Sequence, residues 1–341
     1  MQFFYWPSLR RALLGVLPGL ALVAVPTRAQ VSRSQPNAGF CEQITISSLD
    51  GTGGFEYPAW GAARFNPADD NQVAALRSEI DSAGVVRRHL YVLNLKTHAQ
   101  KRLVRDVGCQ LAWGRTGWLV LERGGQLWRV KANGDSLARL APAANGALYP
   151  AWNPDGRLLA CWQRDSLDPD AWALTLLSPA GHRVRRVPTA GIGLFGPPAW
   201  SPDGRKLAFL SRPHNEQQYY MPSIYELDLA TGKIRTVRQA LERHYPKAAS
   251  VHWLKTGKQL LWRDSERDLA VLNVATGRPQ GKAESGPPRL RILSLDVAAD
   301  SQRLVMVVWE SFRGAGPGAG TLFYRSRLAT AALPGKKLQY W

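Results

Sequence analysis

Short apolar runs alternate with turn residues along most of this chain, and the alternation repeats. Residues 197–211 read PPAWSPDGRKLAFLS. A strand ends at Trp200, the tetrapeptide SPDG follows, and residues 206–210 form a second apolar strand. Proline presets φ in a type I turn, and glycine takes a left-handed conformation without steric cost. The stretch therefore predicts a β-hairpin.

Five further segments repeat this pattern. Residues 150–162 read PAWNPDGRLLACW, and looser copies occupy residues 58–76, 111–121, 251–262 and 295–308. Each copy has one anchor residue near the end of its first strand. The anchors are Trp60, Trp113, Trp152, Trp200, Trp253 and Val297. Consecutive anchors lie about 40–50 residues apart, which is the period of β-propeller blades.

Each hairpin is followed by an alternating apolar run, a turn and, in most copies, a fourth strand that is weak after Gly277. Four strands per period and six periods predict an all-β fold, a six-bladed β-propeller of four-stranded antiparallel blades spanning residues 41–341. A single blade cannot bury both faces, whereas six blades in a ring bury each other. We expect the anchor tryptophans to pack between adjacent blades. Either residues 337–340 or residues 43–48 supply the outer strand of blade six.

The N-terminus has the features of an export signal. Arg10 and Arg11 precede an apolar run at residues 12–25, and Ala29 offers a small residue for cleavage. We therefore expect a signal peptide at residues 1–29, a flexible N-terminal segment at residues 30–40, and a mature protein in the periplasm or outside the cell.

The strings PAWSPDGRKLAFLS and IYELDLATGKIRTV resemble the repeats of TolB-type six-bladed β-propellers. The resemblance covers roughly residues 55–341 and implies the same propeller fold. It implies no activity, since propellers carry many unrelated functions. The TolB of the Tol–Pal envelope system has a mixed α/β domain before its propeller, and we expect none here.

The formal net charge of +18 favours acidic partners. For an exported protein these are an envelope protein, an anionic glycan or the anionic envelope surface, contacted peripherally, and not nucleic acid. The alternative is a solvated basic surface without a partner. We expect a monomer.

The three cysteines are Cys41, Cys109 and Cys161. Export permits disulfides, so Cys41 and Cys109 are candidates for a bridge, while Cys161 lies in an apolar strand and is expected to be a buried thiol. No GxSxG, HExxH, CxxC or P-loop motif is present, so no catalytic residue is predicted.

The residue before each anchor distinguishes two blades from the others. Four blades have alanine there, but blade five has His252 and blade six has Asp296. This pair would approach the central channel, either as a structural pair between blades five and six or as a polar ligand site or weak metal site. Some propellers that this chain resembles bind cations in the channel. We expect no cofactor, with a divalent cation in the channel as the alternative.

Long loops between the second and third strands are expected at residues 78–88, 165–170, 212–222 and 314–320, all on one face. Loops on a rigid scaffold often carry binding residues, and aromatic and basic side chains together suit a glycan or a peptide. The candidate binding residues on this face are His214, Tyr219, Tyr220, His244 and Tyr245. Asp165, Asp168 and Asp170 form either a cation loop or, preferably, a solvated loop.

Together these observations predict an exported, non-enzymatic propeller that binds an envelope protein or an anionic glycan. The alternative is an enzyme, a metal-assisted polysaccharide lyase or hydrolase with its site at the channel mouth. A third hypothesis is a structural subunit of an envelope complex that binds through its basic surface.

Overall fold

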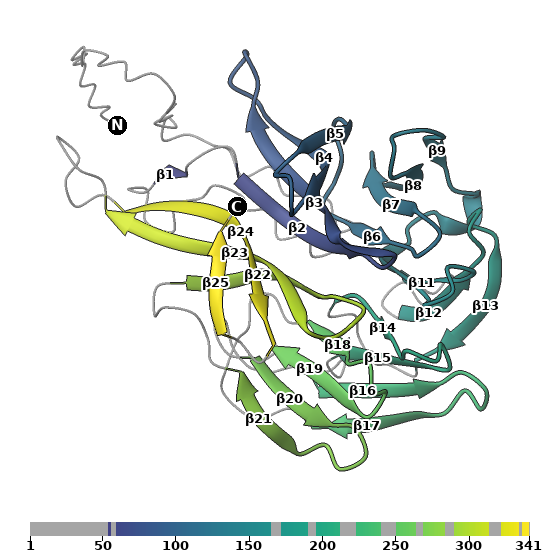
Figure 1. The fold of residues 1–341 in the computed structure, drawn as a ribbon. Coiled ribbons are helices and arrows are strands. Elements are labelled where there is room, and N and C mark those ends of the chain that lie inside the picture. Colours follow the sequence, from purple (N-terminus) through teal and green to yellow (C-terminus); the bar gives the residue numbers. More distant parts are fainter. Residues whose placement is uncertain are drawn as a thin grey trace, which may run out of the picture.

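The computed structural model describes residues 54–55, 59–164, 172–189, 196–211, 223–239, 250–263, 269–283, 290–313, 322–333 and 336–340. These residues form an all-β, six-bladed propeller, as predicted (Figure 1). The one described helical segment is a short 3-10 turn at Pro142–Ala144. No helix among the described residues has the length and apolar character needed to cross a membrane.

The blades follow one another along the sequence. Blade one contains β2 (Ala59–Asn66), β3 (Asp69–Ile80), β4 (Val86–Asn94) and β5 (Gln100–Val104). Blade two contains β6 (Leu111–Trp113), β7 (Trp118–Arg123), β8 (Gln126–Lys131) and β9 (Ala138–Arg139). Blade three contains β10 (Leu148–Trp152), β11 (Leu159–Arg164), β12 (Trp172–Leu177) and β13 (Arg183–Pro188).

Blade four contains β14 (Ala199–Trp200), β15 (Lys206–Ser211), β16 (Ser223–Asp228) and β17 (Ile234–Arg238). Blade five contains β18 (Val251–Trp253), β19 (Gln259–Arg263), β20 (Leu269–Asn273) and β21 (Pro279–Ala283), so the weakly predicted fourth strand after Gly277 does form. Blade six contains β22 (Leu290–Val297), β23 (Arg303–Arg313), β24 (Leu322–Ala332) and β25 (Lys336–Tyr340).

The hydrophobic core is divided among the blade interfaces. Each of the six described clusters of buried apolar residues combines side chains from two consecutive blades, with blade six packing on blade one. The five anchor tryptophans belong to five different clusters and are at most 9% exposed. Their predicted role in packing between adjacent blades is confirmed.

The ring closes between blades six and one. The C-terminal β25 pairs antiparallel with β24 and forms the outer strand of blade six, which is one of the two predicted arrangements. The short β1 (Gly54–Phe55) pairs in parallel with the other end of β24. Residues 43–48, the alternative outer strand, lie outside the described residues.

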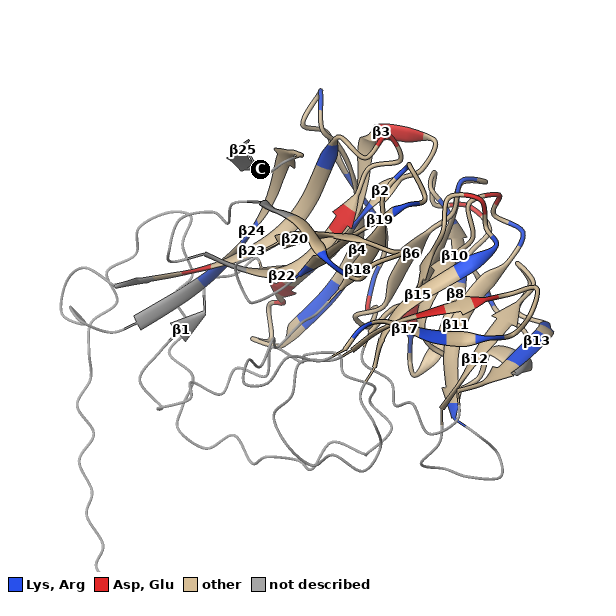
Figure 2. Cartoon of the chain, turned by 90° about the horizontal axis from the view of Figure 1, so that it is seen from below, with Lys and Arg blue, Asp and Glu red and all other residues tan. Residues whose placement is uncertain are grey.

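Basic side chains connect successive blades at their periphery, and Lys and Arg recur along the blades in Figure 2. Lys101 of blade one donates to the carbonyl of Asn133 in a turn of blade two. Arg185 of blade three donates in the same way to Leu229 of blade four. A further pair follows, in which Arg235 of blade four donates to Val274 of blade five at 3.1 Å. Part of the positive charge therefore has a structural use.

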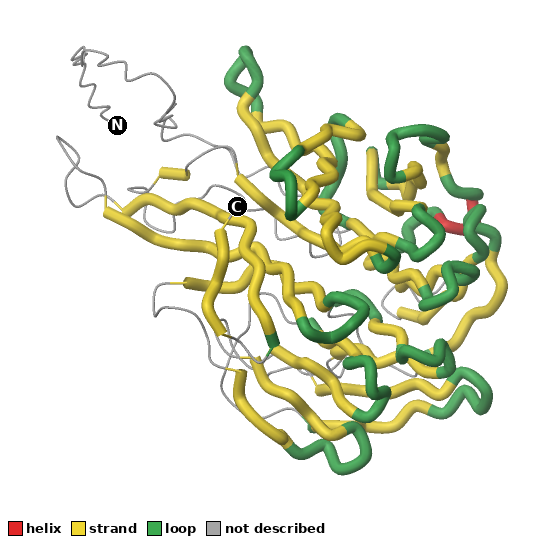
Figure 3. The backbone as a smooth tube through the Cα atoms, in the orientation of Figure 1, coloured by secondary structure: helices red, strands yellow, loops and turns green. Residues whose placement is uncertain are grey.

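Residues 78–88 were predicted as a loop insertion, and this prediction is wrong. β3 and β4 remain paired as far as Ile80 and Val86, with Glu79 opposite Arg87. Only a short turn remains at the tip of this hairpin (Figure 3). There the carboxylate of Asp81 accepts the backbone N–H groups of Ala83 and Val85. The pairing extends because alternating residues on both sides of this turn can form a ladder.

Candidate functional site in the axial channel

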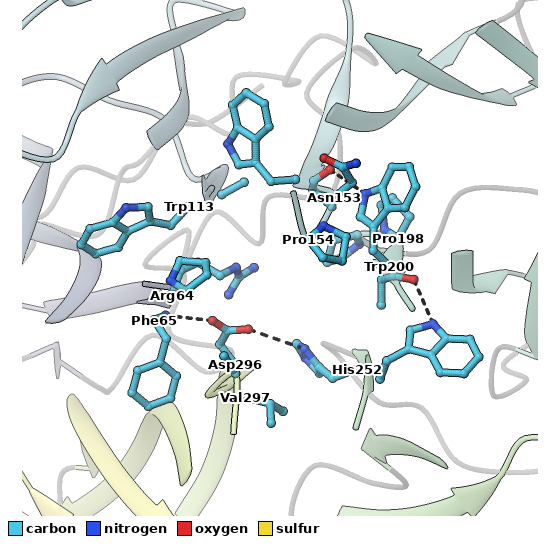
Figure 4. A pocket seen from close by; sticks show the side chains of 18 of the residues that line it. Arg64, Phe65, Trp113, Asn153, Pro154, Pro198, Trp200, His252, Asp296 and Val297 are labelled. Carbon is cyan, nitrogen blue, oxygen red and sulfur yellow. Dashed lines mark hydrogen bonds and ion pairs between the residues drawn. The ribbon is translucent and has the colours of Figure 1, made fainter. Parts of the chain in front are cut away.

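The innermost strands of the six blades surround a cavity of about 270 Å³ on the propeller axis (Figure 4). Its wall has two different halves. Blades two to four contribute mainly tryptophan, alanine and proline residues, together with Arg115 and Asn153. Blades five, six and one contribute His252, Asp296 and Arg64. A charged surface therefore faces a mainly apolar one across the channel.

Asp296 lies at the centre of the charged half and helps to close the ring. Its Oδ2 accepts the backbone N–H of Phe65 at 2.8 Å. Two residues earlier on the same strand, the hydroxyl of Ser294 accepts the N–H of Ala63 at 3.3 Å. These side chains of β22 thus take up alternate N–H groups of β2, because the two innermost strands are not joined by a continuous ladder. We call this contact between blades six and one the seam.

The structure brings the predicted pair, His252 and Asp296, close together. The distance from Nδ1 of His252 to Oδ1 of Asp296 is 3.7 Å, which is longer than a hydrogen bond. The other imidazole nitrogen, Nε2, is buried and has no hydrogen-bond partner among the described residues. Because Asp296 also bonds to Phe65, its main structural contact is with blade one, whereas the sequence suggested blade five.

Electrostatics make His252 a neutral residue at neutral pH. Burial, with a further contribution from the positive charge of Arg64, lowers its pKa from 6.5 to about 3. Burial raises the pKa of Asp296, and this is opposed by Arg64 and by the N–H groups of Phe65 and Val297. The close contact between His252 and Asp296 is therefore not an ion pair at neutral pH.

Arg64 is the functional candidate that the sequence did not reveal. Its Nη1 donates to the carbonyl of Ala63 at 2.7 Å and to Ser294 Oγ at 3.2 Å. Alignment on Trp60 assigned the channel position of blade one to Ala59. The register of β2 against β3 shifts between Trp60 and Ala63, however, so a residue four positions after the anchor reaches the channel. The feature of the sequence that could have identified Arg64 was the presence of a charged residue within a predicted innermost strand.

The apolar half is held in place by the anchors. Trp200 donates through Nε1 to the carbonyl of Ala151 at 2.9 Å. Trp253 donates to the carbonyl of Ala199 at 3.1 Å, again from one blade to the preceding one. Trp200 and Trp253 thus pack against a neighbouring blade with their indole N–H groups satisfied. The indole nitrogens of Trp113 and Trp152 are buried without a hydrogen-bond partner among the described residues.

The channel residues fit a metal ion poorly. The described residues contain no group of three or more His, Cys, Asp or Glu side chains that could hold one. His252 and Asp296 supply two ligands at most, and the guanidinium of Arg64 adds a positive charge that opposes a bound cation. We therefore derive no metal chemistry at this site.

The other predicted sites are placed as follows. His214, Tyr219, Tyr220, His244 and Tyr245 lie outside the described residues, as do Asp165, Asp168 and Asp170. Cys109 is disulfide-bonded. Cys41, its predicted partner, lies outside the described residues. Cys161 is a free, buried thiol, as predicted, and burial raises its pKa.

Comparison with known proteins supports the fold. No family model and no curated protein matches the sequence. Among solved structures, the putative TolB from Agrobacterium tumefaciens is 17% identical with a TM-score of 0.55, covering 75% of this chain and 89% of that one. The β-propeller domain of the Trilobed protease from Pyrococcus furiosus is 12% identical with a TM-score of 0.53, covering 83% and 97%.

A nidogen/laminin complex contains another similar chain, 14% identical with a TM-score of 0.51, covering 66% of this chain and 80% of that one. The names of these proteins describe different functions, so the similarity indicates a shared fold and does not indicate an activity for this chain. With its six sequential blades and its repeated hairpins, the chain has a TolB-like six-bladed β-propeller fold.

Proposed function

We propose that this protein is an exported, non-enzymatic binding scaffold for an anionic partner of the cell envelope, either an acidic glycan or an acidic protein. The observation that supports this most strongly is the charge of the outer strands. Each of the six, β5, β9, β13, β17, β21 and β25, contains at least one Lys or Arg, and none contains Asp or Glu. We call this set of strands the basic rim.

Local pairing neutralises only part of this charge. Arg102 lies 3.8 Å from Glu79, and Arg235 forms an ion pair with Glu226 at 2.9 Å. Lys101 and Arg185 donate to neutral carbonyl groups, which satisfy their hydrogen bonds and leave their charge in place. A positive field therefore remains around the circumference, where it favours encounters with extended anionic molecules.

Basic residues on edge strands also prevent edge-to-edge aggregation, and this effect needs no partner. The two explanations differ in their dependence on position. Aggregation control requires charge on each exposed edge, whereas a binding surface requires a contiguous stretch of it. Arg139 of β9 and Arg183 of β13 are exposed residues on the neighbouring blades two and three, so they are suited to a test.

The first experiment measures binding of the mature protein to polygalacturonate, with uncharged dextran as the control polymer. We expect binding only to the acidic polymer, with an affinity that falls steeply as salt is added. The double variant Arg139→Gln/Arg183→Gln should weaken binding several-fold. The matched variant Arg157→Gln/Arg205→Gln removes the same amount of charge from exposed residues in the turns between the first and second strands of blades three and four. It should weaken binding less, because these turns are not part of the basic rim.

Equal losses in the two double variants would show a response to net charge alone and would contradict a binding surface on the basic rim. An acidic protein as partner predicts weak binding to the polymer and salt-sensitive capture of acidic envelope proteins, which the same variants should reduce. The polymer recovered after incubation should keep its chain length, and shortened chains would overturn the non-enzymatic part of the proposal.

A further inference from the structure

Arg64 and Asp296 place opposite charges on one side of the axial channel without pairing directly with each other, and the exposed Arg115 adds a further positive charge to the lining. Arg64 contributes to the electrostatics of Asp296, so the two groups are near one another. No ion pair within 4.0 Å joins these two described residues, although both side chains point toward the channel space in Figure 4. The arrangement leaves a positive and a negative site on the same wall.

The seam uses only part of each group. Nη1 of Arg64 has two acceptors, but a guanidinium has five N–H donors, and the described residues supply no recorded acceptor for Nε or Nη2. Oδ2 of Asp296 accepts the N–H of Phe65, whereas the closest recorded contact of Oδ1 is His252 at 3.7 Å. Ring closure therefore accounts for Nη1 of Arg64 and Oδ2 of Asp296, and it leaves the other polar atoms of both side chains available to a ligand.

The sign of these charges selects the ligand. A simple cation near Asp296 would be repelled by Arg64, and a simple anion near Arg64 would be repelled by Asp296. A molecule that has both charges satisfies both sites at once. The low-dielectric surroundings that shift the pKa of His252 would strengthen each of these contacts.

The remaining wall and the size of the cavity restrict the ligand further. Trp113, Trp152 and Trp200 lie on the apolar half together with prolines such as Pro154 and Pro198. A volume of about 270 Å³ is at the small end for ligand pockets, so it suits a molecule of amino-acid size. An apolar side chain on the ligand would contact the tryptophan and proline surface.

We propose that the channel binds a small zwitterion of the amino-acid class, with its carboxylate on Arg64, its ammonium group on Oδ1 of Asp296, and its apolar body on the tryptophan wall. This site is separate from the basic rim and does not depend on the function proposed above. Because His252 is neutral, it does not compete with the ligand's ammonium group for the negative charge of Asp296.

The test uses isothermal titration calorimetry of the mature protein with three related probes. L-phenylalanine has both charges, N-acetyl-L-phenylalanine lacks the ammonium group, and L-phenylalanine amide lacks the carboxylate. We expect L-phenylalanine to bind at least about tenfold more tightly than either analogue, a difference of about 1.4 kcal/mol. This comparison needs no mutation and so does not depend on the folding of any variant.

Two variants then assign the charges. Arg64→Gln should remove the preference for L-phenylalanine over its amide, and Asp296→Asn should remove the preference over the N-acetyl compound. Asparagine keeps an oxygen acceptor for the N–H of Phe65, so the seam should persist. Arg157→Gln, an exposed turn residue outside the channel lining, is the control and should bind all three probes as the original protein does.

Absence of any heat of binding for L-phenylalanine, L-leucine and L-tryptophan at millimolar concentration would overturn the proposal. An N-acetyl analogue that binds as tightly as the free amino acid would also overturn it, because Asp296 would then have no role. Loss of polymer binding in the rim variants with unchanged amino-acid binding, or the reverse, distinguishes failure of one proposal from failure of the other.

Discussion

Replacing His252 should change how the stability of this protein depends on pH. The imidazole side chain is 15% exposed, and its pKa falls from 6.5 to about 3 because of burial and the nearby charge of Arg64. The unfolded chain therefore binds a proton near pH 6.5 that the folded chain resists until about pH 3. Stability contributed by the neutral form is complete above pH 6.5 and is lost as the pH falls toward 3.

The size of this effect follows from the two pKa values. For one group that titrates at 6.5 when unfolded and at about 3 when folded, the free energy of unfolding falls by about 2 kcal/mol between pH 7 and pH 5. For a domain of this length, 2 kcal/mol corresponds to a change of about 3 °C in Tm. Asp296 acts in the opposite direction, because its raised pKa favours the folded state at low pH.

The assay compares thermal unfolding at pH 7 and pH 5, at constant ionic strength, for the original protein and for His252→Asn. The original protein should lose about 3 °C more than the variant on acidification. Any packing defect caused by the substitution lowers both of the variant's Tm values and cancels in the difference. His182→Asn removes an exposed histidine and should retain the original pH dependence.

An equal loss of Tm in His252→Asn and in the original protein would refute the reasoning, since it would mean that His252 titrates alike in the folded and unfolded chains. Arg64→Gln gives an independent check. Removing the guanidinium should raise the pKa of His252 and so reduce the acid sensitivity. The same substitution removes the contact with Ser294 and the influence of Arg64 on Asp296, so the comparison uses the difference in Tm between the two pH values.

Two stability predictions concern the seam and the blade contacts. Asp296→Ala leaves the N–H of Phe65 without its acceptor and should lower the free energy of unfolding by about 1–3 kcal/mol, whereas Asp296→Asn should cost less, as measured by urea unfolding. Gly277→Ala should cost at least about 2 kcal/mol more than Gly232→Ala in the same measurement. Both glycines have positive φ, +65° and +72°, but a Cβ on Gly277 would lie 2.1 Å from the carbonyl oxygen of Val237, while the nearest atom to one on Gly232 is 3.5 Å away. Equal costs at the two glycines would contradict the role assigned to this contact.

The repeating hairpins made the architecture predictable. In residues 201–204 the turn chemistry matches the expectation in detail: Asp203 accepts from Ser201 and from the N–H of Arg205, and Gly204 has φ +70°. Because each turn fixes the register of its two strands, six such hairpins place six innermost strands. The anchor tryptophans could then be assigned to the interfaces between blades.

The channel was only partly predictable. His252 and Asp296 precede their anchors by one residue, so comparison of equivalent positions found them. Arg64 was missed because β2 contains a register irregularity, and counting from Trp60 no longer identifies the residue that faces the channel. A repeat pattern specifies the average blade, whereas a bulge in one blade is a local departure that the pattern does not contain.

The meaning of the positive charge was also incomplete at the level of sequence. Composition suggested a field that attracts partners, but Lys101, Arg185 and Arg235 also donate hydrogen bonds to turns of the next blade. Such contacts join residues 32 to 44 positions apart, so they depend on how the blades pack and not on local pattern. These side chains connect the blades and remain exposed.

The charged half of the channel coincides with the place where the ring closes, and this determines which variants are informative. Asp296 accepts the N–H of Phe65 across the seam, so loss of ligand binding in Asp296→Ala could reflect a loosened ring as readily as a missing carboxylate. Asp296→Asn separates these effects, because it removes the charge and keeps an acceptor. Arg64→Gln is less selective, because it removes the charge together with the contact between Nη1 and Ser294 at the seam. If Asp296→Asn changes the preference among the three phenylalanine probes and leaves Tm unchanged, the charge has a role in binding and the hydrogen bond to Phe65 accounts for ring closure.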